Sequence, residues 1–264
     1  MRIGKQDQAY TAIATSDATS ITVRGHDLCE DLIGRVDFSS YLWLLVTGQA
    51  PTAPQKAMLD ACMVAIAEHG LVPSVQAARM TLAAGPDAWQ GAMAAGLLGM
   101  GSVVAGSSEV AGRFLVDLVE EARSQADLAG VVTVRLQAMR ERREKVPGLG
   151  HPQHSGGDPR ADRLLALADE HGVSGRHVAC LRLLGEIAPA VMARPLPINV
   201  SGAIPALMLD AGWPAAALKA VPLVARAGGL AAHLLEETQR SIGFILSHAG
   251  DEAIAYDGAA RGER

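Results

Sequence analysis

The sequence predicts an all-α fold, and three observations support this prediction. Aromatic residues make up only 3% of the 264 residues, so the residues that favour strands do not dominate. Alanine is plentiful and there are 28 glycines, and small side chains allow helices to pack closely. Apolar residues recur at spacings of three and four along most of the chain, which is typical of amphipathic helices.

The predicted helices are bounded by residues that favour helix ends. Capping side chains such as Asp27 and Asp37 precede some of them, prolines stand at the first positions of others, and glycines end several. Residues 10–15 and 20–23 predict short strands or extended segments. The expected helices cover residues 28–33, 38–47, 54–68, 73–84, 109–126, 128–144, 159–171, 175–190, 203–209 and 214–226, with a last helix after residue 229.

An uncharged segment, residues 88–108, is long enough to span a bilayer. Several glycines, among them Gly96 and Gly101, and the serines near its end dilute the hydrophobicity of this segment. We therefore expect a helix that is buried on all sides, for example at a subunit interface, and no membrane partner.

The overall charge and the cysteines restrict the class of function. A net charge of −5 argues against nucleic acid as a partner. Cys29, Cys62 and Cys180 are odd in number and widely spaced, so they match neither a metal site nor a disulfide framework. The residues after Met1 are polar, unlike those of a signal peptide. We expect a cytoplasmic protein that binds no metal.

One loop carries residues that are suited to chemistry. Residues 146–152 read Val-Pro-Gly-Leu-Gly-His-Pro; the glycines expose the backbone, and Pro152 restricts His151 to extended conformations. A histidine held in this way can transfer a proton near neutral pH. Asp158 and a proline then open a helix in which Arg160 is placed to bind an anion. A surface loop followed by a capped helix is the alternative explanation.

The same stretch closely resembles a loop of the citrate synthase superfamily, which reads Val-Pro-Gly-x-Gly-His, a short variable stretch and Asp-Pro-Arg. Other landmarks of the family occur in the same order along nearly the whole chain, in residues 21–52, 68–70, 198–202, 225–237 and 256–258. The chain is identified as a member of this superfamily. Its size resembles that of the compact citryl-CoA lyase-like members.

The resemblance implies a citrate synthase-like fold, in which an active-site cleft lies between a large and a small helical domain. The large domain is expected to comprise residues 1–109 and 206–264, and the small domain residues 110–205. The resemblance also implies a homodimer or a higher even oligomer. Members of the family make or break a carbon–carbon bond between an acyl-CoA enolate and a keto acid such as oxaloacetate.

The resemblance further implies roles for single residues. His151 is expected to polarise the keto carbonyl, which becomes the hydroxyl of the product. Arg160 and Arg226 are expected to hold carboxylates, with His69 nearby. The backbone of the loop is expected to contact the adenine of coenzyme A, through Val146, Pro147, Gly148, Leu149 and Gly150. A coenzyme A thioester is then a substrate, and no tightly bound cofactor is expected.

Two residues depart from the pattern of the family. Val104 replaces the catalytic histidine, and valine cannot hydrogen-bond a thioester enolate. Ser201 replaces the catalytic aspartate, and a serine hydroxyl without a partner is no general base at neutral pH. We therefore do not expect ordinary citrate synthesis. Glu109 is either a substitute carboxylate or a helix-start residue, and Glu236 is expected to form a structural pair with His233.

The leading hypothesis is a citryl-CoA lyase-like enzyme that cleaves citryl-CoA, or a related 3-hydroxyacyl-CoA, to acetyl-CoA and a keto acid. Such a lyase need not deprotonate acetyl-CoA. His151 is expected to remove the hydroxyl proton of citryl-CoA, and Ser201 at best relays a proton. The first alternative is a catalytically silent homologue that binds coenzyme A or a carboxylate. The second is a citrate synthase-type acyltransferase that condenses acetyl-CoA with oxaloacetate.

Overall fold

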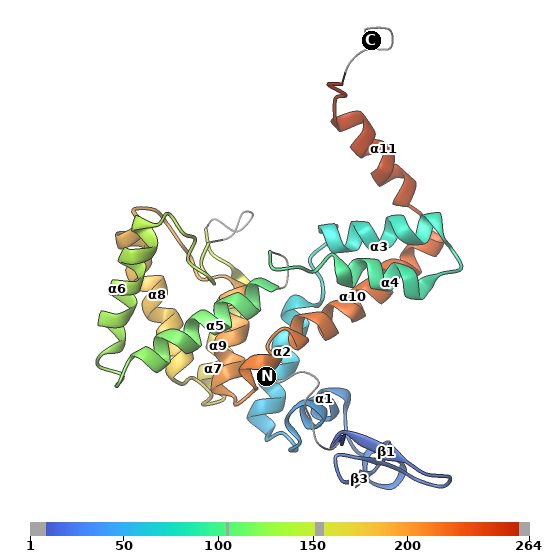
Figure 1. Cartoon of the computed structure of the whole chain (residues 1–264), viewed down its shortest axis with the longest axis horizontal. Helices are drawn as coiled ribbons and strands as arrows, with labels where there is room; N and C mark the ends of the chain where they lie inside the picture. Colours follow the sequence, from blue (N-terminus) through green and yellow to red (C-terminus); the bar gives the residue numbers. More distant parts are fainter. Residues whose placement is uncertain (1–8, 104–105, 151–155, 259–264) are drawn as a thin grey trace.

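The structure, a computed structural model, describes residues 9–103, 106–150 and 156–258. It confirms the all-α fold, which a small three-stranded sheet accompanies near the N-terminus (Figure 1). The strands are β1 (Ala14–Ser16), β2 (Ile21–Val23) and β3 (His26–Asp27). The helices are α1 (Phe38–Thr47), α2 (Ala53–Ala67), α3 (Pro73–Ala84), α4 (Trp89–Leu98), α5 (Gly106–Glu121), α6 (Leu128–Glu141), α7 (Pro159–Glu170), α8 (Arg176–Met192), α9 (Val200–Asp210), α10 (Ala220–Gln239) and α11 (Gly243–Ala253), with a π-helix at Leu28–Leu32 and a 3-10 helix at Ala215–Ala217.

The sheet near the N-terminus is antiparallel. Strand β1 pairs with β2 and β2 with β3, and Ala14 lies opposite Val23. This confirms the extended structure that the sequence predicts here. The side chain of Asp27 accepts hydrogen bonds from the amides of Cys29 and Glu30 at 2.8 and 2.9 Å, so it caps the following helix as predicted.

Local side chains explain where the next helices begin and end. The carboxylate of Asp37 accepts a hydrogen bond from the amide of Ser40 at 3.0 Å, which caps α1. Gly48 ends α1 with a φ angle of 77°, a conformation that favours glycine. At the start of α2, the side chains of Thr52 and Gln55 each bind the backbone amide of the other residue, at 3.4 and 2.8 Å.

The segment 88–108 differs from the expectation. Helix α4 ends at Leu98, and α5 begins as a separate helix. Ala92 and Gly96 are buried where α4 packs on α3 and α10, whereas the side chain of Leu98 is 84% exposed. The prediction of a helix buried on all sides was therefore wrong for the single chain, because α3 and α10 cover one face of α4 and leave the other open.

Within the described ranges, one helical stretch, Ala215–Gln239, is long and apolar enough by length and composition to cross a bilayer. It contains α10, which packs against α2, α3 and α4. Leu230 and Leu234 of α10 are fully buried between these helices. One face of α10 is therefore packed against other helices, and 39% of the apolar window of this stretch is buried.

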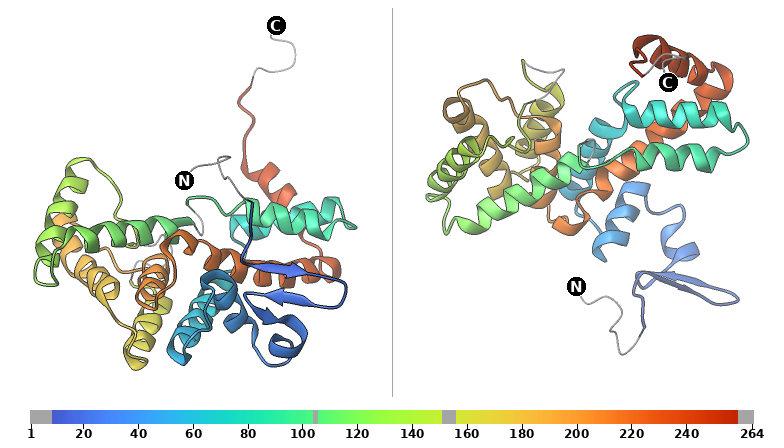
Figure 2. Two further views of the ribbon diagram at one scale, coloured as in Figure 1. Left: turned by 60° about the horizontal axis from the view of Figure 1, so that its bottom comes forward. Right: turned by 45° about the horizontal axis from the view of Figure 1, so that its top comes forward.

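Three groups of buried side chains hold the described elements together, and the smallest, Val23, Leu32 and Leu44, joins β2, the π-helix and α1. The largest core joins α1 and α2 to α5–α9 and includes the edge-to-face pair of Trp43 and Trp213, whose ring centres are 5.2 Å apart. The second core joins α3, α4 and the second half of α10. Figures 1 and 2 show α5–α9 at one end of the molecule and α3, α4 and α10 at the other, with α2 between them. The largest core thus crosses the boundary predicted near residue 110, and the division into residues 1–109 with 206–264 and residues 110–205 stays a prediction.

A buried ion cluster joins α3 to the end of α10. Arg79 is 2% exposed; its Nε donates to Glu237 at 2.6 Å and its Nη1 to Glu236 at 2.6 Å. The Glu237 carboxylate also accepts hydrogen bonds from the hydroxyl of Ser241 at 2.7 Å and the amide of Gly243 at 2.8 Å. Burial raises the pKa of Glu237, but these hydrogen bonds outweigh it and lower the pKa to about 2. The cluster therefore fixes the start of α11 with an ionised carboxylate.

Candidate active site

The predicted CoA loop, residues 146–150, lies against the start of α9. Gly148 and Gly150 have φ angles of 81° and 73°, in the left-handed region that favours glycine. The amide of Gly150 donates to the carbonyl of Pro197 at 2.7 Å, and the amide of Asn199 donates to the carbonyl of Gly148 at 3.0 Å. These hydrogen bonds place two segments that are distant in the sequence side by side.

A close approach of two backbones explains the glycine at position 148. A Cβ on Gly148 would lie 2.9 Å from the Cα of Gly202, in the first turn of α9. Asn199 caps this turn, since its side chain accepts from the amide of Gly202 at 3.1 Å and donates to the carbonyl of Gly150 at 2.5 Å. The loop and the first turn of α9 therefore form one unit.

Asp158 links this unit to the predicted substrate-binding Arg160. The buried carboxylate of Asp158 caps α7 by accepting from the amide of Arg160 at 3.1 Å, as the sequence predicts. It also accepts from Nε and Nη2 of Arg160, both at 2.9 Å, and from the amide of Val200 at 2.9 Å. Burial raises the pKa of Asp158, but the hydrogen bonds from Arg160 and Val200 outweigh it, so the pKa falls below its ordinary value.

The sequence identifies Asp158 as a helix cap but does not reveal that it also orients Arg160. Because Nε and Nη2 of Arg160 donate to Asp158, Nη1 is among the donors that are left for a further carboxylate. In the sequence, the only indication of this ion pair is that the acidic Asp158 stands two positions before the basic Arg160 at the start of a helix.

Arg226 places a buried positive charge close to Arg160 and Glu68. Its side chain on α10 is 5% exposed, and among the described residues its Nη1 has no hydrogen-bond partner. Burial lowers the pKa of Arg226 below its ordinary value; the charge of Glu68 opposes this shift and that of Arg160 adds to it. Because arginine stays charged in proteins, a guanidinium buried in this way is suited to binding an anion.

Glu68 positions the backbone around His69. Its carboxylate accepts from the amides of His69 and Gly70 at 2.8 and 2.6 Å and lies 3.1 Å from Nε2 of His233. Burial raises the pKa of Glu68, but these hydrogen bonds lower it below its ordinary value. The expected pair of His233 with Glu236 is wrong, because Glu236 binds an arginine of α3 instead. Glu68 was not predicted as a site residue, although it directly precedes His69.

Ser201, at the second position of α9, meets a serine from another helix. The hydroxyl of Ser107 donates to the hydroxyl of Ser201 at 2.9 Å. Ser107 is the second residue of α5, so the first turns of α5 and α9 meet at this pair. Glu109, considered above as a substitute carboxylate, pairs with the exposed Arg113 at 2.5 Å, which agrees with its alternative role at a helix start.

The structure connects several of the predicted site residues. Hydrogen bonds join the loop 146–150, the first turn of α9 with Ser201, and Arg160. His151, the predicted proton acceptor, lies outside the described residues, as does Val104. In the part of the chain that the structure describes, no cluster of three His, Cys, Asp or Glu side chains could hold a metal ion.

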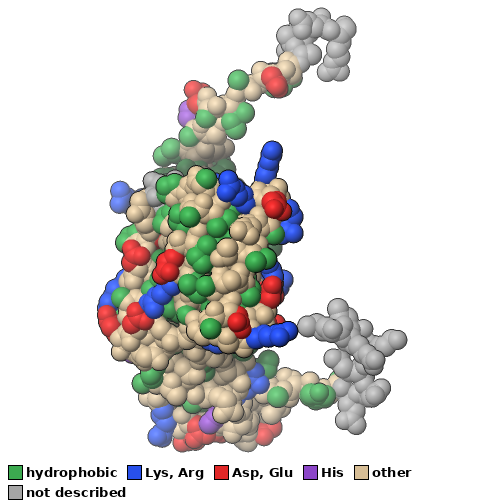
Figure 3. Space-filling model, turned by 90° about the vertical axis from the view of Figure 1, so that its left-hand side faces the viewer, with side chains coloured by type: hydrophobic (Ala, Val, Ile, Leu, Met, Phe, Trp, Pro, Cys, Tyr) green, Lys and Arg blue, Asp and Glu red, His purple; other side chains and the backbone are tan. Residues whose placement is uncertain are grey.

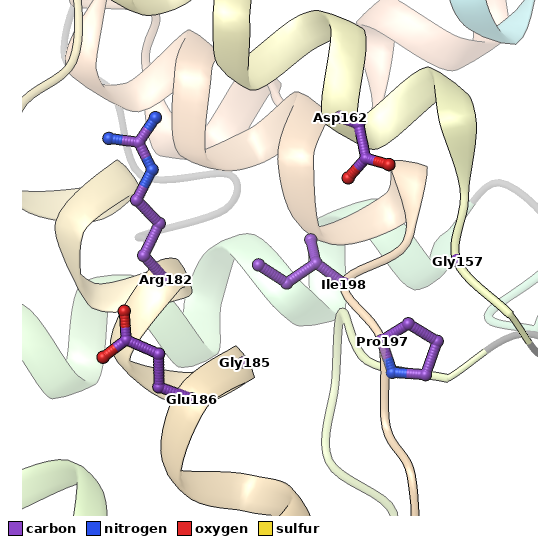
Figure 4. A pocket seen from close by; sticks show the side chains of 7 residues that line it. All are labelled: Gly157, Asp162, Arg182, Gly185, Glu186, Pro197 and Ile198. Atoms are coloured by element: carbon purple, nitrogen blue, oxygen red, sulfur yellow. The ribbon is translucent and has the colours of Figure 1, made fainter.

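A cavity of about 290 Å³ opens beside the segment that pairs with the predicted CoA loop. Figure 4 shows Pro197 and Ile198 of this segment together with side chains of α7 and α8. The residues that line the cavity are Gly157, Asp162, Arg182, Gly185, Glu186, Pro197 and Ile198. A second cavity, of about 500 Å³, lies between α2 and α7 and reaches Arg160. Both cavities thus border the region that contains the predicted site residues.

Known proteins resemble this chain in sequence. The sequence profile described as "Citrate synthase, C-terminal domain" matches residues 53–245. The chain is 29% identical over 183 residues to "Putative citrate synthase 2" of Mycobacterium bovis, in a match that covers 68% of this chain and 47% of that protein. The chain therefore spans about half the length of the curated relatives it matches.

Solved structures resemble this chain in fold. Citryl-CoA lyase from Hydrogenobacter thermophilus is 28% identical, with a TM-score of 0.86 over 97% of both chains. ATP citrate lyase from Methanothrix soehngenii, solved in complex with citrate and coenzyme A, is 21% identical, with a TM-score of 0.79 over 99% of this chain and 43% of that one. The second likeness shows the fold alone. Together they confirm the predicted citrate synthase-like fold.

Proposed function

Since the chain belongs to the citrate synthase family, we propose that it is a citryl-CoA lyase-like carbon–carbon lyase. Its substrate is citryl-CoA or a related 3-hydroxyacyl-CoA. Its products are an acyl-CoA such as acetyl-CoA and a keto acid such as oxaloacetate. The likeness to a citryl-CoA lyase over nearly the whole chain supports this proposal.

The single observation that carries the proposal is the buried guanidinium of Arg226, whose Nη1 has no partner within the described chain. Arg160 lies close to it and keeps donors available on the side away from Asp158. Two arginines in one region favour a ligand that carries two carboxylates, as citryl-CoA does. The backbone of residues 146–150 is the proposed contact for the coenzyme A part of the substrate.

Cleavage requires proton and electron transfers that balance. A base removes the hydroxyl proton of citryl-CoA, and the alkoxide becomes the carbonyl of the keto acid as the carbon–carbon bond breaks. The electrons of this bond form the enolate of the acyl-CoA, which then takes up a proton at its α-carbon. We assign the first proton transfer to His151, because an imidazole can accept a proton near neutral pH.

Incubation of the purified protein with citryl-CoA tests the proposed reaction. We expect acetyl-CoA and oxaloacetate to appear in equal amounts, measured by chromatography and a coupled dehydrogenase assay. His151→Ala is expected to lower the rate about 100- to 10,000-fold, since it removes a general base. Turnover by the wild-type protein no faster than that of His151→Ala would exclude the lyase.

Val104 and Ser201 favour a second candidate, a catalytically silent homologue that binds coenzyme A. This candidate predicts binding of coenzyme A without turnover of any 3-hydroxyacyl-CoA in a panel, and activity on one of them excludes it. Release of free coenzyme A from acetyl-CoA and oxaloacetate would instead indicate a citrate synthase-type acyltransferase.

We also propose that the protein forms a homodimer or a higher even oligomer. Helix α11 projects from the body of the molecule (Figures 1 and 3), and its Phe244 and Ile245 are 67% and 63% exposed. A helix of 11 residues has little stability in water unless it packs against other elements, and α11 packs against α3 at its start. A second copy of the chain that covers these apolar side chains would supply this packing.

Light scattering after gel filtration measures the oligomeric state. We expect a mass of at least two chains for the wild-type protein and a shift toward one chain for Phe244→Glu, which places a charge in the apolar contact. Val134→Glu is the matched control, since Val134 on α6 is 64% exposed. A monomeric wild-type protein contradicts the proposed assembly.

A further inference from the structure

Two serine hydroxyls meet where the first turns of α5 and α9 come together. The Oγ atoms of Ser107 and Ser201 are 2.9 Å apart, and both side chains are partly buried. The pair has two hydroxyl protons, and the hydrogen bond between the serines uses one of them. Within residues 9–103, 106–150 and 156–258, the other proton has no acceptor. It is therefore available to a ligand.

The surroundings of this pair favour a negatively charged ligand. The first turns of α5 and α9 both present the positive end of a helix dipole. Cε of Lys219, the residue that precedes α10, lies 3.9 Å from the position that a Cβ on Gly106 would take, at the first residue of α5. Glu109, in the same turn of α5, is paired with Arg113. The region is therefore suited to stabilising an anion.

The pair also lies beside the proposed CoA-binding loop. A Cβ on Gly148 would lie 2.9 Å from the Cα of Gly202, on the helix of Ser201. The same atom would lie 3.5 Å from the Cβ of Ala111, on the helix of Ser107. The backbone of the loop therefore touches both helices that carry the serines, which places the pair in the same region of the molecule as the proposed contact for coenzyme A.

We propose that Ser201 donates a hydrogen bond to the enolate oxygen of the acyl-CoA as the carbon–carbon bond breaks, and that Ser107 is the positioning residue that orients the Ser201 hydroxyl. This inference rests on the proposed lyase function and deepens it, because it names the group that stabilises the enolate in a chain with Val104. Neutral donors in a positive region stabilise an oxyanion without acting as a base.

Binding of two coenzyme A derivatives separates this role from a purely structural one. The carboxylate of carboxymethyl-CoA places a negative oxygen near the position of the enolate oxygen, whereas acetyl-CoA presents a neutral carbonyl. We expect Ser107→Ala and Ser201→Ala each to weaken the binding of carboxymethyl-CoA about 10-fold, the size of one hydrogen bond to a charged group. The affinity for acetyl-CoA is expected to change less than about twofold. Calorimetric titration measures both dissociation constants.

Two further variants control for general effects. Ser107→Thr keeps a hydroxyl and is expected to restore the binding of carboxymethyl-CoA. Ser108→Ala removes a neighbouring buried hydroxyl that has no partner in the described chain, and it is expected to leave both affinities unchanged. Serine hydroxyls do not titrate between about pH 6 and about pH 9. The loss of affinity for carboxymethyl-CoA in the alanine variants is therefore expected to be equal at about pH 6 and about pH 9. An equal loss for both ligands, or a loss for neither, would overturn the inference.

Turnover of citryl-CoA distinguishes a failure of this inference from a failure of the proposed function. We expect Ser107→Ala to lower kcat about 10-fold with KM within about twofold of the wild-type value. If the wild-type protein cleaves citryl-CoA and Ser107→Ala keeps its kcat, the lyase assignment stands and the inference fails. If the wild-type protein does not cleave citryl-CoA but the serines still select carboxymethyl-CoA, the lyase assignment fails and the pair remains an oxyanion site.

Discussion

Replacing Arg226 by methionine is expected to slow citryl-CoA cleavage strongly and at the same time to raise the thermal stability of the protein. The guanidinium is 5% exposed, and in the described part of the chain its Nη1 has no partner, so the folded protein keeps a desolvated charge. Exchanging buried charged groups for apolar side chains of similar volume is often neutral or stabilising, by about 1–4 kcal/mol. A thermal melt is expected to show a Tm higher by a few degrees, at about 2–4 °C per kcal/mol.

The same substitution removes the donor that the proposed substrate requires. Truncating one partner of a buried, hydrogen-bonded charge pair costs about 2–5 kcal/mol, so we expect kcat/KM to fall roughly 30- to 4,000-fold. Arg135→Met is the matched control, because Arg135 on α6 pairs with Glu121 at the end of α5 and is not a proposed site residue; neither its Tm nor its activity is expected to change. An Arg226→Met protein that is less stable and still active contradicts the proposed binding site.

Glu237→Gln is expected to destabilise the protein strongly at neutral pH. The carboxylate accepts hydrogen bonds from Arg79 at 2.6 Å, Ser241 at 2.7 Å and Gly243 at 2.8 Å. A neutral glutamine leaves the buried guanidinium of Arg79 without this counter-charge, and removing one partner of a buried ion pair costs about 3–5 kcal/mol. Urea unfolding followed by circular dichroism measures the free energy of unfolding of both proteins.

The effect of Glu237→Gln is expected to depend on pH. Burial raises the pKa of Glu237, but the hydrogen bonds from Ser241, Arg79 and two amides lower it from an ordinary value of 4.5 to about 2. A carboxylate with a lowered pKa stabilises the folded protein above its ordinary pKa, and this stabilisation is lost as the pH falls through the folded-state value. The difference in the free energy of unfolding between the wild-type protein and Glu237→Gln is therefore expected to be largest near pH 7 and to decrease between pH 4.5 and about 2.

Glu236→Gln provides the control for this measurement. The side chain of Glu236 is 45% exposed, although it binds the same Arg79, and an exposed partner contributes less than about 1 kcal/mol. If the difference in the free energy of unfolding between the wild-type protein and Glu237→Gln stays constant from neutral pH to the acid range, this contradicts the role assigned to the Glu237 carboxylate.

Much of the fold was predictable because helix ends depend on local hydrogen bonds. The caps at Asp27, Asp37 and Asp158 are confirmed, and in each the capping oxygen and the amide are two or three residues apart. The burial of α4 was not predictable. Its composition is apolar, but its exposure depends on which other helices cover it, and α3 and α10 cover only one face.

Some residues of the candidate site were likewise predictable from the sequence, and others were not. The loop 146–150, Arg160 and Ser201 were identified by residue type and order along the chain. Ser107 was not, because nothing in its local sequence indicates that it meets Ser201, a residue 94 positions away. Glu68 was missed for the same reason, since its contact with His233 joins the end of α2 to α10.

The sequence by itself determined that the chain is helical, where most helices begin, and which loop and arginines are candidates for the site, because capping and periodicity are properties of short stretches and motifs are identified by residue type and order. Only the tertiary structure decided that Asp158 orients Arg160 while it accepts from the amide of Val200 at the start of α9, and that Arg226 is buried with an Nη1 that has no partner among the described residues. The physical reason is that desolvation and ion pairing depend on the groups that surround a side chain in space. Those groups come from helices that are far apart in the sequence.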